Sequence, residues 1–108
     1  MNIDPINRAM NTTPSSSDTE RTLGWKLILE SAKIGEKRGD LDKAEQLYER
    51  ALVMAAHRLG DDNIIVAHIL MQFAQFYENQ KRHEKAAPLH ARAREILAAY
   101  TQAFMPNM

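Results

Sequence analysis

The chain has 108 residues, which is enough for one small domain. Fourteen basic residues balance fourteen acidic ones, so the overall charge gives no attraction to nucleic acid, to an anionic membrane or to an acidic substrate. The absence of cysteine excludes a disulfide framework, a thiolate zinc site and a cysteine nucleophile. An apolar content of 44% and a charged content of 26% are typical of a globular protein.

Residues 1–18 contain two prolines and a run of three serines without a helical period, so we expect a flexible amino-terminal tail. They contain no apolar signal segment, and no stretch approaches the length of a membrane span, so a cytoplasmic location is the expectation. A first helix is expected over residues 19–38, ending before a left-handed Gly39. Its apolar side is expected to hold Leu23, Leu27, Ile28, Ala32 and Ile34.

Three more helices are expected, over residues 41–59, 64–80 and 83–103, with a frayed end over residues 105–108. The helix over 64–80 is apolar nearly all round, which is typical of a helix surrounded by others. Pro88 lies early in the last helix. Proline suits the first turn of a helix better than its interior, so a kink at Pro88 is the alternative to a helix that starts near Glu84. With no β pattern, we expect an all-α fold of four antiparallel helices joined by short loops.

The second half of the chain repeats the first at a fixed interval. Four identities lie 42 residues apart, at Ala44/Ala86, Leu47/Leu89, Arg50/Arg92 and Ala51/Ala93. Self-similarity at one interval indicates a repeat protein. The alanines fall on an apolar helical stripe, where small side chains let another helix approach closely.

The two halves resemble tetratricopeptide repeats (TPRs). The residues that carry the resemblance are Ile28, Ala32, Gly39, Ala44, Tyr48 and Ala51 in the first half, and Leu70, Phe73, Ala74, Tyr77, Ala86 and Ala93 in the second. The interval is longer than the roughly 34 residues of ordinary TPRs, and this longer form is similar to the repeats of kinesin light chain. The resemblance implies two tandem helix–turn–helix units, residues 19–60 and 61–104, in a short right-handed α-solenoid.

The resemblance also implies a binding surface, because the first helix of each TPR unit lines a concave groove that holds peptides or partner helices. Carried over by alignment, the groove residues are Lys26, Leu29, Lys33, Glu36 and Lys37 from the first helix, and His68, Met71, Gln72, Gln75, Glu78 and Asn79 from the third. Lysines facing amides would attract an acidic segment or a terminal carboxylate. A solvated charged face is the alternative interpretation.

These features predict a non-enzymatic adaptor that binds a protein partner. The alternative is a structural module that self-associates into a homo-oligomer through Trp25 and the last helix, where Ile96, Leu97, Tyr100 and Phe104 share one face. Those four side chains either meet a second copy or pack within the monomer. Trp25, the one tryptophan, fits either a binding hot spot or an apolar lid under the tail.

Other classes of site find little support in the sequence. The four histidines lack the spacing of a metal site, and no cofactor motif, phosphate loop or nucleophile elbow is present, so we expect no metal, no cofactor and no catalysis. Nucleic-acid binding through Lys26, Lys33, Lys37, Lys81 and Arg82 lacks interleaved aromatic residues and is the weakest hypothesis.

Overall fold

The structure, a computed structural model, describes residues 14–104, with side chains from residue 24 onward. This part of the chain consists of four α-helices and contains no strand: α2 (Pro14–Arg38), α3 (Leu41–Leu59), α4 (Ile64–Asn79) and α5 (His83–Phe104). The expected all-α fold is confirmed. Residues 1–13 and 105–108, which include most of the expected tail and the expected frayed end, lie outside the described residues.

The helix α2 begins five residues earlier than the sequence analysis expects, so residues 14–18 are helical. Pro14 fits a first helical position, because the N–H that proline lacks has no intrahelical partner there. The hydrophobic period of α2 starts only near Leu23, so its polar first turns carry no period that reveals a helix. The expected bounds of the other three helices are confirmed to within one residue.

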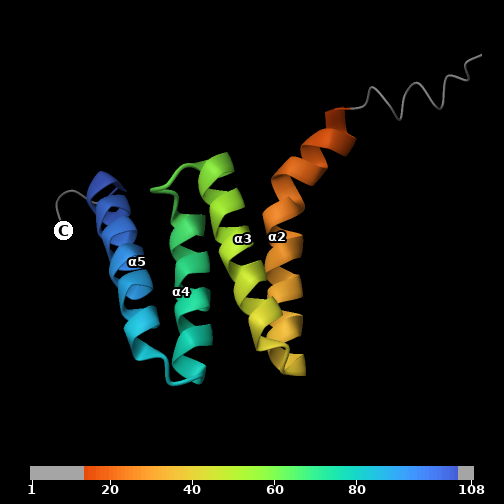
Figure 1. Ribbon diagram of the computed structural model, residues 1–108. Coiled ribbons are helices and arrows are strands. Elements are labelled where there is room, and N and C mark those ends of the chain that lie inside the picture. The colour runs from red at the N-terminus through yellow and green to blue at the C-terminus, as the bar shows by residue number, and fades with distance from the viewer. Residues whose placement is uncertain (1–13, 105–108) are drawn as a thin grey trace, which may run out of the picture.

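The four helices stand in a row, each antiparallel to the next (Figure 1). The helices α2 and α3 form one helix–turn–helix unit, α4 and α5 form the second, and α3 packs on α4 to join the two units. The pairing within each unit depends on small residues, because Ala32, Ala44, Ala74 and Ala86 have no exposed surface. This confirms the close helix approach that the repeated alanines predict.

The helix α4 forms the centre of the hydrophobic core. Its buried residues are Val66, Ala67, Ile69, Leu70, Phe73, Ala74, Phe76 and Tyr77. Phe73 and Phe76 lie against Tyr48 of α3, with ring centroids 5.5 and 5.1 Å apart, so aromatic contacts hold the two units together. Ile96 is also buried and Leu97 partly so, which confirms packing within the monomer for these two residues of α5.

The apolar side of α2 differs from the expectation. Trp25, Leu29 and Ala32 are buried, whereas Leu27 and Ile34 are 65% and 49% exposed. The expectation was therefore wrong for Leu27 and Ile34. The helix has apolar residues on two sides, and its neighbours cover the side with Trp25 and Ala32.

The turns between helices use left-handed residues and one side-chain cap. Gly39 and Gly60 follow α2 and α3 with φ of 85° and 100°, and Lys81 follows α4 with φ of 63°. Asn63 caps α4, since its side chain accepts a hydrogen bond of 2.8 Å from the N–H of Ile65. The helix α5 continues through Pro88 without interruption.

Candidate functional site

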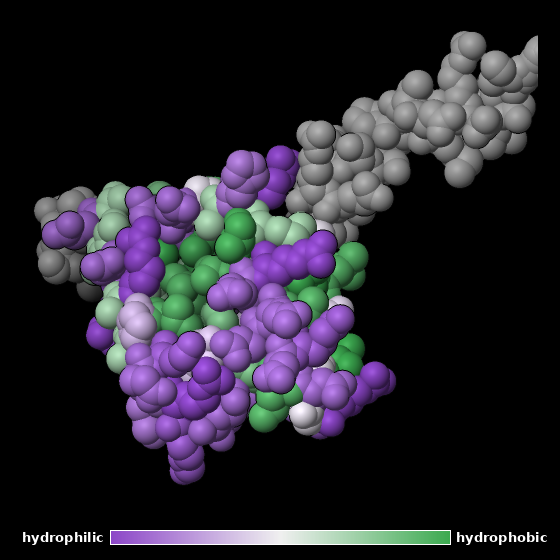
Figure 2. Space-filling view, in the orientation of Figure 1, coloured by the Kyte–Doolittle hydropathy of each residue, from purple (hydrophilic) through white to green (hydrophobic). Residues whose placement is uncertain are grey.

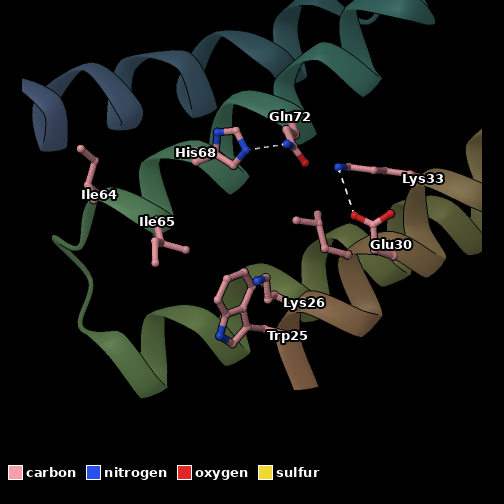
Figure 3. A pocket seen from close by; sticks show the side chains of 9 residues that line it. Trp25, Lys26, Glu30, Lys33, Ile64, Ile65, His68 and Gln72 are labelled. Carbon is pink, nitrogen blue, oxygen red and sulfur yellow. Dashed lines mark hydrogen bonds and ion pairs between the residues drawn. The ribbon is translucent and has the colours of Figure 1, made fainter. Parts of the chain in front are cut away.

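A pocket of about 560 Å³ lies between the first helices of the two units (Figure 3). Its lining residues are Trp25, Lys26, Leu29, Glu30 and Lys33 from α2, and Ile64, Ile65, His68 and Gln72 from α4. The tryptophan and the leucine are almost fully buried and form an apolar floor, and Ile64 is 38% exposed at the opposite wall. The pocket is thus an apolar hollow with charged and amide groups at its edge, as in many ligand-binding sites.

The polar groups at the edge are arranged in two pairs. Lys33 Nζ lies 3.4 Å from Glu30 Oε2, and the Gln72 amide nitrogen lies 2.7 Å from His68 Nε2. The amide oxygen of Gln72 is buried without a hydrogen-bond partner among the described residues, and Figure 3 shows it on the side that faces α2. Among the described side chains, Lys26 forms no ion pair.

The other end of the groove between α2 and α4 is closed by hydrogen bonds. Glu36 accepts one from the Tyr48 hydroxyl (2.9 Å) and one from the Asn79 amide (3.0 Å), and Gln75 donates to Asn79 (3.0 Å). Burial raises the pKa of Tyr48 above its ordinary value, and the hydrogen bond to Glu36 raises it further. Figure 2 shows the same division, with hydrophobic surface in the upper half and polar side chains at the lower end, where the α2–α3 and α4–α5 turns lie.

The structure brings five of the eleven predicted groove residues into this pocket: Lys26, Leu29, Lys33, His68 and Gln72. The other six lie on the same helices but do not line it: Glu36, Lys37, Met71, Gln75, Glu78 and Asn79. Met71 is 44% exposed, and Gln75 and Asn79 take part in the hydrogen bonds that close the groove.

Sequence reasoning missed Glu30, Ile64 and Ile65 as pocket residues. A signal for Glu30 was present, since it lies one helical turn from both Lys26 and Lys33. Ile64 and Ile65 lie one turn before His68, but their apolar character suggested only a core position. The structure also places Trp25, predicted as a self-association residue, in the floor of the pocket.

A second carboxylate, Glu45 of α3, joins the two units beside the groove. It accepts a hydrogen bond from the Tyr77 hydroxyl (2.7 Å) and another from Arg82 (3.2 Å). The Tyr77 hydroxyl lowers the pKa of Glu45, and Arg82 adds to this effect against the opposing effect of burial. Burial, followed by the bond to Glu45, raises the pKa of Tyr77. These contacts fix the position of α4 relative to α3, and hence the width of the groove.

The two histidines of α5 contact one carboxylate of α4. Glu78 lies within hydrogen-bond reach of His83 Nδ1, and its other oxygen lies 3.3 Å from His90 Nε2. The hydrogen bond from His83, and then the one from His90, lowers the pKa of Glu78. Within the described residues, no group of three or more histidine, aspartate or glutamate side chains is placed to hold a metal ion.

Two stacked helix–turn–helix units with a groove between their first helices define the class of helical-repeat proteins. The family model of the tetratricopeptide repeat matches residues 28–99, two thirds of the chain, and the chain belongs to this family. No curated protein and no solved structure matches it. TPRs generally mediate protein–protein interactions and typically perform no catalysis. No helix in the described part of the chain is long and apolar enough to cross a bilayer.

Proposed function

We propose that this chain is an adaptor that binds a segment of a partner protein in the pocket between α2 and α4 and performs no chemistry. The observation that carries the proposal is the pocket itself, an open hollow of about 560 Å³ with an apolar floor beside two lysines. Peptides are recognised by such a combination, because an apolar anchor supplies affinity and charged neighbours select the sequence around it. The 42-residue interval of the repeat supports a likeness to the repeats of kinesin light chain. The cytoplasmic location of the chain stays a prediction.

The charges at the pocket edge favour an acidic segment. Lys26 and Lys33 lie seven residues apart on one side of α2, about two helical turns or 10 Å. Glu30 lies between them and offsets one of the two charges, which leaves the edge net positive. We therefore expect the ligand to place an apolar side chain over Trp25 and Leu29, with a carboxylate near Lys26.

The unpaired oxygen of Gln72 supports a polypeptide ligand over a purely apolar one. A buried acceptor without a donor costs about 1–3 kcal/mol. A backbone N–H of a bound segment would supply that donor after a small rotation of the amide, while His68 keeps its contact with the amide nitrogen.

Selection from a random peptide library displayed on phage tests this proposal. We expect the selected peptides to combine one large apolar residue with neighbouring acidic residues, and to change the fluorescence of Trp25, the one tryptophan of the chain. Lys33→Glu should weaken their binding about tenfold or more, since it reverses one charge at the pocket edge. Lys43→Glu makes the same charge change on α3 outside the pocket and is the control.

Two results would refute the groove assignment. One is peptides that bind Lys33→Glu as tightly as the unchanged chain. The other is peptides whose affinity falls equally in Lys43→Glu. Far-UV circular dichroism of each variant shows whether the helices are retained.

Self-association through the last helix is the second candidate function. Tyr100 and Phe104 favour it, because they are 42% and 69% exposed and their rings lie together, tilted by 40° with centroids 4.7 Å apart. Trp25 does not support a contact there, because only 8% of its surface is exposed and it faces the pocket.

A further inference from the structure

His68 and Gln72 form a hydrogen-bonded pair on the α4 side of the pocket edge. They lie one helical turn apart, with His68 Nε2 at 2.7 Å from the Gln72 amide nitrogen. An amide nitrogen donates and does not accept, so the ring of His68 is neutral in this arrangement and its Nε2 is the acceptor. The amide oxygen of Gln72 is left buried, without a hydrogen-bond partner among the described residues, and it faces α2 (Figure 3).

A proton on His68 reverses this arrangement. Both ring nitrogens of an imidazolium are donors, so the Nε2–H of His68 would point at the N–H groups of Gln72. A half-turn of the Gln72 amide removes the conflict, because its oxygen then accepts from His68 and its NH2 group takes the place that faces α2. The two residues therefore present an acceptor to the pocket when His68 is neutral, and a donor when it is charged.

The charges across the pocket act in the same direction. The charged side chains that line the pocket together with His68 come from α2 and are Lys26, Glu30 and Lys33. Glu30 offsets one of the lysines, since its Oε2 lies 3.4 Å from Lys33 Nζ. The pocket edge is thus already net positive, and an imidazolium at His68 adds a further positive charge beside it.

Charged groups that the neighbouring elements place against α4 bond elsewhere: Glu45 with Arg82, Arg92 with Asp62, and His83 and His90 with Glu78. Glu78 lies ten residues after His68, about 15 Å along the helix. Among the described side chains, the hydrogen-bond partner of His68 is Gln72. A change of charge at His68 therefore acts on Gln72 and on the pocket.

We propose that His68 is a specificity-determining residue whose protonation makes the pocket select a carboxylate of the bound segment. This inference rests on the proposed function of the pocket as a peptide-binding site. Histidine is the side chain that ordinarily changes charge between pH 8 and pH 5.5, a range in which glutamate and lysine keep theirs. Protonated, the pair offers a carboxylate a cation and an N–H donor, whereas the neutral pair offers it an unpaired oxygen that repels it. An acidic segment therefore binds more tightly as the pH falls through this range.

Titration of Trp25 fluorescence with two matched probes tests the proposal. One is an acetylated and amidated peptide in which glutamates flank a leucine on both sides, and the other has glutamines in place of the glutamates. From pH 8 to pH 5.5 we expect the Kd of the acidic peptide to fall about three- to fivefold, the effect of one charge at an exposed edge. The Kd of the neutral peptide should stay constant. His68→Gln should abolish the fall, whereas His57→Gln, at an exposed histidine of α3 outside the pocket, should retain it.

Nuclear magnetic resonance of the chain without peptide tests the rotation of the amide separately. The side-chain N–H signals of Gln72 should shift with pH along the same curve as the ring signals of His68, and they should stay in place in His68→Gln. The amide of Gln75, which donates to Asn79 on the same helix, is the internal control and should not shift.

Three results would overturn the proposal and leave the adaptor function standing. One is an acidic peptide that binds with the same Kd at both pH values. Another is Gln72 signals that do not follow the ring of His68. The third is a pH effect that persists in His68→Gln and disappears in His90→Gln, which would assign it to the contact with Glu78. Failure of both peptides to bind at either pH would instead refute this proposal together with the adaptor function.

Discussion

The two helix–turn–helix units share one pattern but differ in what lies beside their first helix. Ile34 in α2 and Phe76 in α4 occupy equivalent positions 42 residues apart, yet Ile34 is 49% exposed and Phe76 is 1% exposed. The difference comes from the neighbouring helix, since α3 covers α4 on the face that is open on α2. Position in the stack, rather than the local helical pattern, therefore decides how much each apolar residue contributes to stability.

The units also differ in how they end their first helix. Gly39 and Lys81 lie at equivalent positions, and both adopt positive φ, of 85° and 63°. Glycine adopts this conformation without a steric cost, whereas lysine does not. The residue after Lys81 is Arg82, which bonds to Glu45 of the first unit. The second unit therefore combines a strained turn with a contact that joins the two units.

The largest expected effect comes from the equivalent pair Phe76→Ala and Ile34→Ala. Phe76→Ala should lower the free energy of unfolding by about 3–5 kcal/mol, which is comparable with the whole stability of a domain of this size. Ile34→Ala should lower it by about 0.5 kcal/mol. Urea unfolding followed by circular dichroism, at a concentration where the chain is monomeric, measures both. Equal losses would contradict the difference in burial between the two units.

The tyrosines that join the units have the next largest effect. Tyr77→Phe removes the hydroxyl that bonds to Glu45, and Tyr48→Phe removes the one that bonds to Glu36. Each should cost about 1–2 kcal/mol of unfolding free energy, because a partly buried hydrogen bond to a carboxylate is lost. Tyr100→Phe, at an exposed ring on α5, should change stability by less than about 0.5 kcal/mol. The same urea titration compares all three, and a loss for Tyr100→Phe as large as the others would refute the assignment.

The same groups predict how stability depends on pH. The pKa values of Tyr48 and Tyr77 are raised in the folded chain, so their contribution is complete below the ordinary phenol value of 10.0 and is lost as pH rises above it. The pKa of Glu45 is lowered, so its contribution is present above its ordinary value of 4.5 and is lost as pH falls below it. Thermal unfolding across the pH range should show both losses. Tyr77→Phe should weaken the alkaline one, and an unchanged alkaline loss in Tyr48→Phe/Tyr77→Phe would contradict this origin.

Exchanging the turn residues should change stability by no more than the tyrosine variants do, and in opposite directions at the two turns. Gly39→Lys should destabilise the chain by about 1–2 kcal/mol, the cost of positive φ for a residue with a Cβ, since no atom lies within 4 Å to obstruct the side chain. Lys81→Gly should stabilise it by about 0.5–1 kcal/mol, because relief of that cost exceeds the added entropy of glycine in the unfolded state. Melting temperatures that move in the same direction would show that the two turns are not equivalent.

The sequence predicts the fold well, because its signals are local. The bounds of α3 follow from the apolar stripe between Asp40 and Gly60, and the tandem units follow from alanines at one interval. The start of α2 was missed, because a helix without an apolar period near its beginning resembles a polar tail. The exposure of Leu27 and Ile34 was missed for another reason, since a pattern of apolar residues does not specify which side of a helix a neighbour covers.

The candidate site was predicted in part. Helical spacing and alignment placed Lys26, Lys33 and Gln72 on the faces of α2 and α4 that line the pocket. They did not reveal that Glu36 and Asn79 bond across the groove and close one end of it, because such a contact depends on the distance between α2 and α4. That distance is set by the packing of α3 on α4.

Fluorescence of Trp25 during titration with a peptide selected on this chain tests the central claim most directly, because the only tryptophan lines the proposed binding pocket. The account predicts a saturable change in emission that gives the same Kd as an independent binding measurement. In Lys33→Glu the change should shift to higher peptide concentration, and in Lys43→Glu it should stay where it is. A peptide that binds tightly while the emission of Trp25 stays constant, with equal affinity for all three chains, would show that the pocket between α2 and α4 is not the binding site.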